Sequence, residues 1–214
     1  TINHSMQNRP QSKVSLSSKE VSTLLEFFPH GICAFDLEMT GLSPLIDKII
    51  EIAAIKITPN GETSTYHSLV NPLITIPEHT IKYHGLHNED LKDAPTIKKP
   101  LKDFIEFFGN MPLVAHSSQF DASFIIRAMH EFNFEPSLSD VYDSCRSART
   151  IYKKEDIAPA SFKLGDLAEF YKIDFDHHQA LDDAITCLKI FAHTLEFLKQ
   201  YKPCLLYTSP SPRD

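Results

Sequence analysis

Three apolar runs in the first third of the chain predict three consecutive β-strands. Residues 31–35 (GICAF) are typical of a buried strand, and residues 48–57 (KIIEIAAIKI) form a longer run rich in β-branched side chains. Residues 59–61 (PNG) supply a tight turn, after which residues 65–70 (TYHSLV) alternate between the two faces of a strand. The pattern therefore predicts a meander of three strands.

Apolar residues at helical spacing predict five helices. The first spans residues 21–28 with Ser17 or Ser18 as its cap, and the second begins at a Thr96 cap and ends at Gly109. The other three are a helix with Phe120, Phe124, Ala128, Met129 and Phe132 on one side, a helix over residues 163–171 and a helix over residues 180–198.

Two short apolar runs, residues 113–115 and 141–144, predict further strands between these helices. Pro100 does not interrupt the second helix, because it falls in the first turn, where backbone N–H groups have no intrahelical acceptor. Strands that come first and then alternate with helices are typical of a mixed-sheet α/β domain.

Composition places the chain among globular proteins of one domain. It has 214 residues, of which 42% are hydrophobic and 23% are charged. No apolar run is long enough for a membrane span or a signal peptide, so we expect no membrane contact and a cytoplasmic location. The four cysteines lack CxxC spacing, which favours reduced thiols over a zinc site or a disulfide framework.

The formal net charge of −7 limits the kind of nucleic-acid binding that the chain can perform. A protein that holds long duplex DNA through many phosphate contacts normally has a basic surface. An acidic chain instead fits an enzyme that handles a strand end through bound metal, or one that a partner delivers to its substrate.

Both ends of the chain are expected to lie outside the fold. Residues 1–16 carry no periodicity in their first dozen positions and are interpreted as a disordered or non-native segment. The final residues, CLLYTSPSPRD, resemble a translated sequencing adapter, the alternative being a natural Ser/Pro-rich tail. The predicted domain spans residues 17–202, and residues 203–214 form a disordered tail.

Asp36 and Glu38 are the first candidates for chemistry. They lie two residues apart directly after the strand run, so strand geometry would place both side chains on one face. Two adjacent carboxylates repel each other unless a cation or a shared proton offsets the charge. A divalent metal is therefore one interpretation, and two solvated carboxylates at a strand end are the other.

Two more segments hold acids at helix starts. Asp121 follows the strand at residues 113–115, at a strand end where α/β folds commonly place functional groups. Asp182 and Asp183 lie in the first turn of the last helix, just after His177 and His178. Taken alone, each acid is explained as a favourable charge at a helix N-terminus, and the helical wheel does not separate Asp182 from Asp183.

The segments FDLEMTGL, AHSSQFDASF and HHQALDDA, in this order, resemble the three exonuclease motifs of the DnaQ-like 3′–5′ exonucleases of DEDDh type. The resemblance covers residues 31–198 and implies an RNase H-like mixed sheet with an antiparallel meander, parallel strands and flanking helices. It implies four metal-binding carboxylates and a general base, which are Asp36, Glu38, Asp121, Asp183 and His178. Asp183 is preferred over Asp182 because it follows His178 by five residues and precedes an alanine.

The resemblance also implies cofactors and a substrate pocket. Four acids suit two divalent cations, Mg²⁺ or Mn²⁺, which bind carboxylate oxygens and assist phosphodiester hydrolysis. The residues expected to contact the terminal nucleotide are Thr40, Gly41, Leu42, His84 and Phe120. His84 has a second interpretation, a loop histidine satisfied within the protein, and Ser117 stands where many relatives have asparagine.

The leading hypothesis is a metal-dependent 3′–5′ exonuclease that releases nucleoside 5′-monophosphates from single-stranded DNA in proofreading or repair. Two alternatives stay open. One is an RNA-trimming exoribonuclease similar to oligoribonuclease or RNase T, since DLEMTGL is also similar to oligoribonuclease. The other is an inactive RNase H-like scaffold that binds a polymerase. A DNA polymerase is accordingly a candidate partner.

Overall fold

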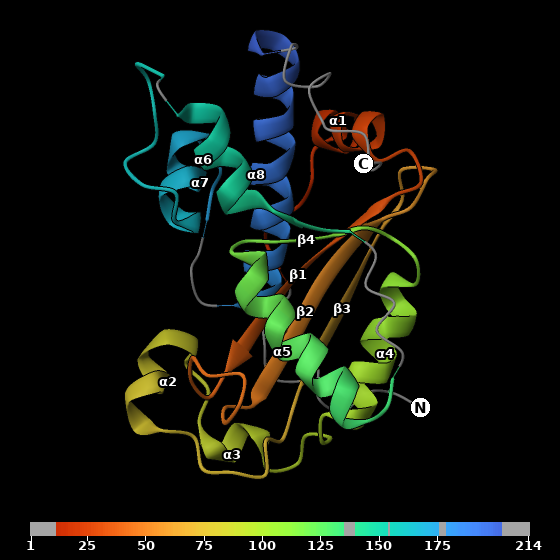
Figure 1. Cartoon of the computed structure of the whole chain (residues 1–214), viewed down its shortest axis with the longest axis vertical. Helices are drawn as coiled ribbons and strands as arrows, with labels where there is room; N and C mark the ends of the chain where they lie inside the picture. Colours follow the sequence, from red (N-terminus) through yellow and green to blue (C-terminus); the bar gives the residue numbers. More distant parts are fainter. Residues whose placement is uncertain (1–11, 135–139, 154, 176–178, 203–214) are drawn as a thin grey trace, which may run out of the picture.

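A five-stranded sheet lies at the centre of this computed structural model, which describes residues 12–134, 140–153, 155–175 and 179–202 (Figure 1). The sheet has the strand order β3-β2-β1-β4-β5. The strands are β1 (Ile32–Met39), β2 (Ile49–Ile57), β3 (Thr63–Leu69), β4 (Leu113–Ala115) and β5 (Val141–Asp143). Every predicted strand is present.

The strand pairing confirms the predicted mixed sheet. β1, β2 and β3 pair antiparallel as a meander, whereas β4 pairs parallel with β1 and β5 pairs parallel with β4. β1 is longer than the apolar run alone, because it continues through Asp36 and Glu38 to Met39. In its ladder with β2, Asp36 lies opposite Ala53 and Glu38 lies opposite Glu51.

Eight helices surround the sheet in the described part of the chain. They are α1 (Ser18–Phe27), α2 (Glu78–His84), α3 (Asn88–Leu91), α4 (Lys98–Phe108), α5 (Ser118–Glu131), α6 (Ser144–Tyr152), α7 (Leu164–Phe170) and α8 (Ala180–Tyr201). Five of them correspond to the five predicted helices. The sequence pattern did not predict α2, α3 or α6.

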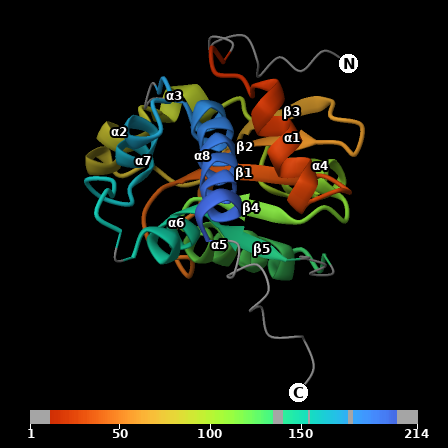
Figure 2. The ribbon, with the colours of Figure 1, turned by 90° about the horizontal axis from the view of Figure 1, so that it is seen from above.

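Helices cover both faces of the sheet. α1 and α8 pack together on one face (Figure 2). There, Ile32 and Ala34 of β1 belong to a buried cluster that includes Ile185 and Leu188 of α8. α4 and α5 cover the other face, and Phe35 of β1 belongs to that cluster. Because side chains alternate along a strand, Asp36 and Glu38 continue the row of Ile32 and Ala34 toward α8.

One of the predicted helix caps is present in the structure and another is not. Ser17 caps α1 in a capping box, in which Glu20 N–H donates to the serine and the Glu20 carboxylate accepts from the Ser17 N–H. The predicted Thr96 cap is wrong, since α4 begins at Lys98 and its cap position is Ile97. Pro100 is the third residue of α4 and therefore lies in the first turn, as predicted.

Part of the N-terminal segment contacts the fold. Val14 and Leu16 pack against the cluster under α1 and α8, and the Lys189 ammonium donates to the Ser15 carbonyl oxygen. Residues 1–11 and the tail from residue 203 lie outside the described residues, so the domain limits 17–202 stay a prediction. Within the described part of the chain, no helix combines the length and the apolar character that crossing a bilayer requires.

Candidate active site

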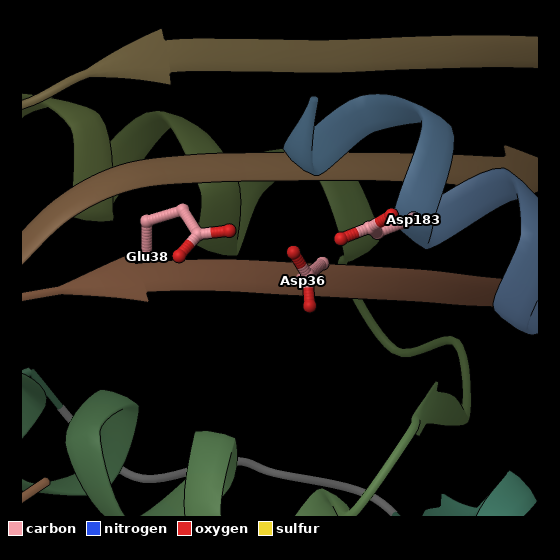
Figure 3. A group of neighbouring side chains, drawn as sticks. All are labelled: Asp36, Glu38 and Asp183. Carbon is pink, nitrogen blue, oxygen red and sulfur yellow. The ribbon is translucent and has the colours of Figure 1, made fainter. Parts of the chain in front are cut away.

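Three acids meet where β1 passes under the start of α8. Asp36 and Glu38 come from β1 and Asp183 comes from the first turn of α8 (Figure 3). One carboxylate oxygen of each residue lies within 4.8 Å of those of the other two. Strand alternation and the packing of α8 on that face of the sheet thus bring together residues almost 150 positions apart.

Asp182 and Asp183 have different surroundings. The Asp182 carboxylate accepts a hydrogen bond from the Ser12 hydroxyl and is not part of the three-acid group. Asp183 instead contributes to the group with Asp36 and Glu38. The structure therefore places at the site the aspartate that the motif spacing preferred.

Asp121 is buried in the first turn of α5 but lies outside the three-acid group. α5 begins at an unusual turn, because Ser117 has left-handed backbone angles, with φ 65° and ψ 53°. The Asp143 carboxylate accepts from the backbone N–H groups of Ser117 and Ser118, at 3.2 and 3.0 Å. Asp143 at the end of β5 therefore fixes the helix start that carries Asp121.

The electrostatics of the cluster favour a cation. Burial, followed by the charges of Asp121, Asp183, Glu38 and Glu51, holds the pKa of Asp36 well above its usual range. Burial also raises the pKa of Asp121 well above its usual range, with further contributions from Glu38 and Asp143.

Asp183 shows the same effect, since burial and the charges of Asp182 and Glu51 raise its pKa to about 7. Asp36 Oδ2 and Asp183 Oδ1 are buried without a hydrogen-bond partner. Unsatisfied carboxylate oxygens that repel one another are the donor set that a hard divalent cation prefers. The residues present thus fit a metal site.

The loop after β1 holds three residues expected at the substrate. The Thr40 hydroxyl is buried, donates to Asp47 Oδ1 at 3.2 Å and accepts from the Lys48 N–H at 3.0 Å. A side chain at Gly41 would meet the Asp47 carboxylate at 2.4–2.6 Å, so the glycine makes room for Asp47. Leu42 is 81% exposed and its side chain is accessible from solvent.

His84 lies in a closed hydrogen-bond network at the end of α2. Its Nδ1 accepts from the Leu86 N–H at 3.0 Å, and its Nε2 lies 3.1 Å from the Thr80 hydroxyl oxygen. Because the Thr80 hydroxyl donates to the Pro77 carbonyl, Nε2 is the donor to Thr80. These contacts favour the structural interpretation of His84 over direct substrate contact through the ring nitrogens.

Phe120, the neighbour of Asp121 in the sequence, lines a groove of about 1430 Å³ that runs along β5 and α6. Its ring packs edge-on against Phe124 at 5.3 Å. His178, the residue expected as general base, lies outside the described residues.

Glu51 is a buried acid near the cluster that the motifs did not identify. It is 0% exposed and contacts His67, with 2.7 Å between Glu51 Oε1 and His67 Nε2. The available signal was a lone glutamate within the apolar run of residues 48–57. A buried charge in such a run needs a partner, and the partner comes from the next strand.

Comparison with known proteins identifies the family. Residues 33–191 match the family model described as Exonuclease (RNase_T), which covers more than half of the chain. The chain therefore belongs to this exonuclease family. The family resemblance that the three motifs predicted is confirmed.

The relatives that this chain resembles in sequence include DNA polymerases III of PolC type. DNA polymerase III PolC-type of Caldanaerobacter subterraneus subsp. tengcongensis is 37% identical over 167 residues, which cover 78% of this chain and 12% of that protein. The PolC-type polymerase of Staphylococcus epidermidis is 34% identical over 168 residues, 78% of this chain and 11% of that protein. The chain thus spans about a tenth of the length of these relatives.

Solved structures share the fold. The nuclease domain of 3′hExo, a DEDDh family member bound to rAMP, has a TM-score of 0.66 at 22% identity, over 79% of this chain and 93% of that one. Exonuclease I of E. coli in complex with a dT13 oligonucleotide also has a TM-score of 0.66, at 14% identity over 83% of this chain and 42% of that one. The predicted RNase H-like exonuclease fold is confirmed.

Proposed function

We propose that the chain is a metal-dependent 3′–5′ exonuclease that hydrolyses the terminal phosphodiester bond of single-stranded DNA and releases nucleoside 5′-monophosphates. The observation that carries the proposal is the convergence of Asp36, Glu38 and Asp183 on one face of the sheet. Membership of the exonuclease family and the similarity to PolC-type polymerases support it.

The proposed role of the four acids is to bind metal ions. Asp36, Glu38, Asp121 and Asp183 would hold two divalent cations, Mg²⁺ or Mn²⁺, by their carboxylate oxygens. When bound, such cations activate a water and stabilise the departing 3′ oxygen. Burial keeps water from screening the carboxylates, which strengthens their attraction for a cation.

His178 is proposed as the general base. A neutral imidazole takes the proton from the attacking water, and a positioned base of this kind contributes about 10²–10⁴ in rate. The motif spacing that preferred Asp183 also assigns this role to His178.

The terminal nucleotide is proposed to lie against the loop after β1. Leu42 offers an exposed apolar side chain, and Phe120 offers an aromatic ring beside Asp121. Thr40 and Gly41 act indirectly, since the Thr40 hydroxyl donates to Asp47 and Gly41 leaves room for the Asp47 carboxylate. His84 would shape the pocket through its backbone turn rather than through its ring nitrogens.

The PolC-type relatives favour a replicative setting in the cytoplasm, with a DNA polymerase as partner. RNA trimming is the second candidate, because the structural neighbour 3′hExo was solved with rAMP. An inactive scaffold is disfavoured because all four motif carboxylates are present in the sequence.

The test uses 5′-labelled single-stranded DNA and a matched short RNA, incubated with Mg²⁺, Mn²⁺ or EDTA. Stepwise shortening from the 3′ end that requires metal, and that Asp36→Ala, Asp121→Ala or Asp183→Ala abolishes, is the expected result. Faster shortening of RNA would replace the DNA assignment. Equal rates in wild type and the three variants would refute the site, and no shortening of either strand would favour the scaffold.

A further inference from the structure

A further buried acid lies on the sheet beside the acidic cluster. Glu51 of β2 lies directly opposite Glu38 of β1 in the antiparallel ladder. Side chains opposite each other in such a pair point to the same face, with Cβ atoms about 5 Å apart. Glu51 is therefore a fully buried acid on the same face as the cluster.

His67 holds Glu51 from the next strand. Ala53 of β2 lies opposite both Asp36 on β1 and His67 on β3, so Asp36, Ala53 and His67 form one row across three strands. From this row, His67 Nε2 reaches diagonally to Glu51 Oε1 at 2.7 Å. The side chain of His67 is 13% exposed, so the contact is shielded from water.

Glu51 is also electrostatically linked to the cluster. On β2 it lies opposite Glu38 and two residues before Ala53, which lies opposite Asp36, so its carboxylate is beside two members of the cluster in a buried region. Two interpretations follow. Glu51 and His67 could serve only to join β2 to β3, or Glu51 could add negative charge where a cation binds.

We propose that Glu51, oriented by His67, is a positioning residue that increases the divalent-cation affinity of the cluster of Asp36, Glu38 and Asp183. This inference rests on the proposed function, because it concerns the cations of that site. The charge of Glu51 acts from outside the ligand set, in a buried region where Coulomb attraction is weakly screened. Outer groups of this kind typically change metal affinity by about 10–100-fold.

The test titrates the full metal-free chain with Mn²⁺ by calorimetry and records the melting temperature of each metal-free variant. Glu51→Gln keeps the shape of the side chain but removes its charge, so it is expected to weaken Mn²⁺ binding about tenfold. Its metal-free melting temperature should not fall, because the change also removes repulsion from Glu38. Glu51→Asp keeps the charge and should lose less affinity than Glu51→Gln.

A dissociation constant of Glu51→Gln within about twofold of wild type would overturn the inference and leave Glu51 a structural residue. Glu62→Gln changes the same charge at an exposed turn position and is expected to bind Mn²⁺ like wild type. If Glu51→Gln does not fold, His67→Ala decides, with a severalfold loss of affinity in support and an unchanged affinity against.

Asp36→Asn separates this inference from the proposed function. It removes a carboxylate of the cluster itself and should abolish Mn²⁺ binding. Wild-type affinity in Asp36→Asn would overturn the metal site and the role of Glu51 together. Loss of binding in Asp36→Asn with full binding in Glu51→Gln would overturn the role of Glu51 alone.

Discussion

Asp182 and Asp183 are adjacent in sequence and differ in what their side chains contact. Asp183 joins Asp36 and Glu38, whereas Asp182 accepts from the Ser12 hydroxyl. We expect Asp183→Asn to lower the exonuclease turnover number by at least about 10³-fold, as for removal of one member of a catalytic unit. Asp182→Asn is the matched control and should retain turnover within about threefold. Steady-state kinetics on a labelled oligonucleotide measures both, and the reverse order would contradict the assignment.

Ser117 is a residue in a costly backbone conformation. Its φ of 65° lies in the left-handed region, which asparagine adopts more readily than serine, and its side chain makes no capping hydrogen bond. Ser117→Asn should therefore raise the free energy of unfolding by about 0.5–1 kcal/mol in urea denaturation. Ser117→Ala keeps the strain and should give no gain. A stability gain in the alanine variant equal to that of asparagine would refute this explanation.

At the scale of elements, one carboxylate caps two helices. Asp143 accepts from the N–H groups of Ser117 and Ser118 at the start of α5 and from the Arg146 N–H in α6. Asp143→Ala leaves all three donors without this acceptor and should cost about 2 kcal/mol of unfolding free energy. Turnover should fall as well, because α5 carries Asp121. Asp140→Ala, an exposed neighbour, is the control and should change neither quantity.

The packing of α1 on α8 depends on one buried glutamate. Burial alone would raise the pKa of Glu20, but hydrogen bonds from His193, Lys189 and the Ser17 N–H lower it to about 2. Because this folded-state pKa lies below the ordinary value of 4.5, the stabilisation is complete above about pH 4.5 and is lost as the pH falls toward 2.

Glu20→Gln should accordingly cost about 1.5–3 kcal/mol at pH 7, the range for hydrogen bonds to a charged group. The difference from wild type should shrink as the pH falls below 4.5, which urea denaturation at several pH values measures. Glu26→Gln removes the exposed pair with Lys199 and should leave the free energy of unfolding almost unchanged at every pH. A difference for Glu20→Gln that is independent of pH would contradict the ionic role.

At the scale of the whole molecule, the sequence predicted those helices and strands that have a clear local pattern of apolar residues. β2 has a long apolar run and α8 has a long periodic apolar pattern, and both were found, whereas α2 and α3 are short and α6 has a mostly polar sequence. The acids of the cluster were found because their motifs resemble a known family. Glu51 was missed because its importance depends on which residues lie opposite it in β1 and β3, and register is a property of the folded sheet.

Because the whole chain is acidic, stabilisation by Mn²⁺ bound at a site has to be distinguished from the general screening of charge by salt. With a net charge of −7, any salt reduces self-repulsion, whereas only a site binds Mn²⁺ at low concentration. At a Mn²⁺ concentration 100 times the dissociation constant, binding should stabilise the fold by about 2.7 kcal/mol. That corresponds to a rise of about 5–10 °C in melting temperature for a chain of this size.

Sodium chloride at matched ionic strength is the first control for this shift and should give a much smaller rise. Asp36→Asn is the second, because it retains almost all of the negative charge of the chain but lacks one carboxylate of the cluster. An equal Mn²⁺ shift in wild type and Asp36→Asn would mean that the cation acts on the charge of the whole molecule. A shift confined to wild type would locate its binding at the meeting point of β1 and α8.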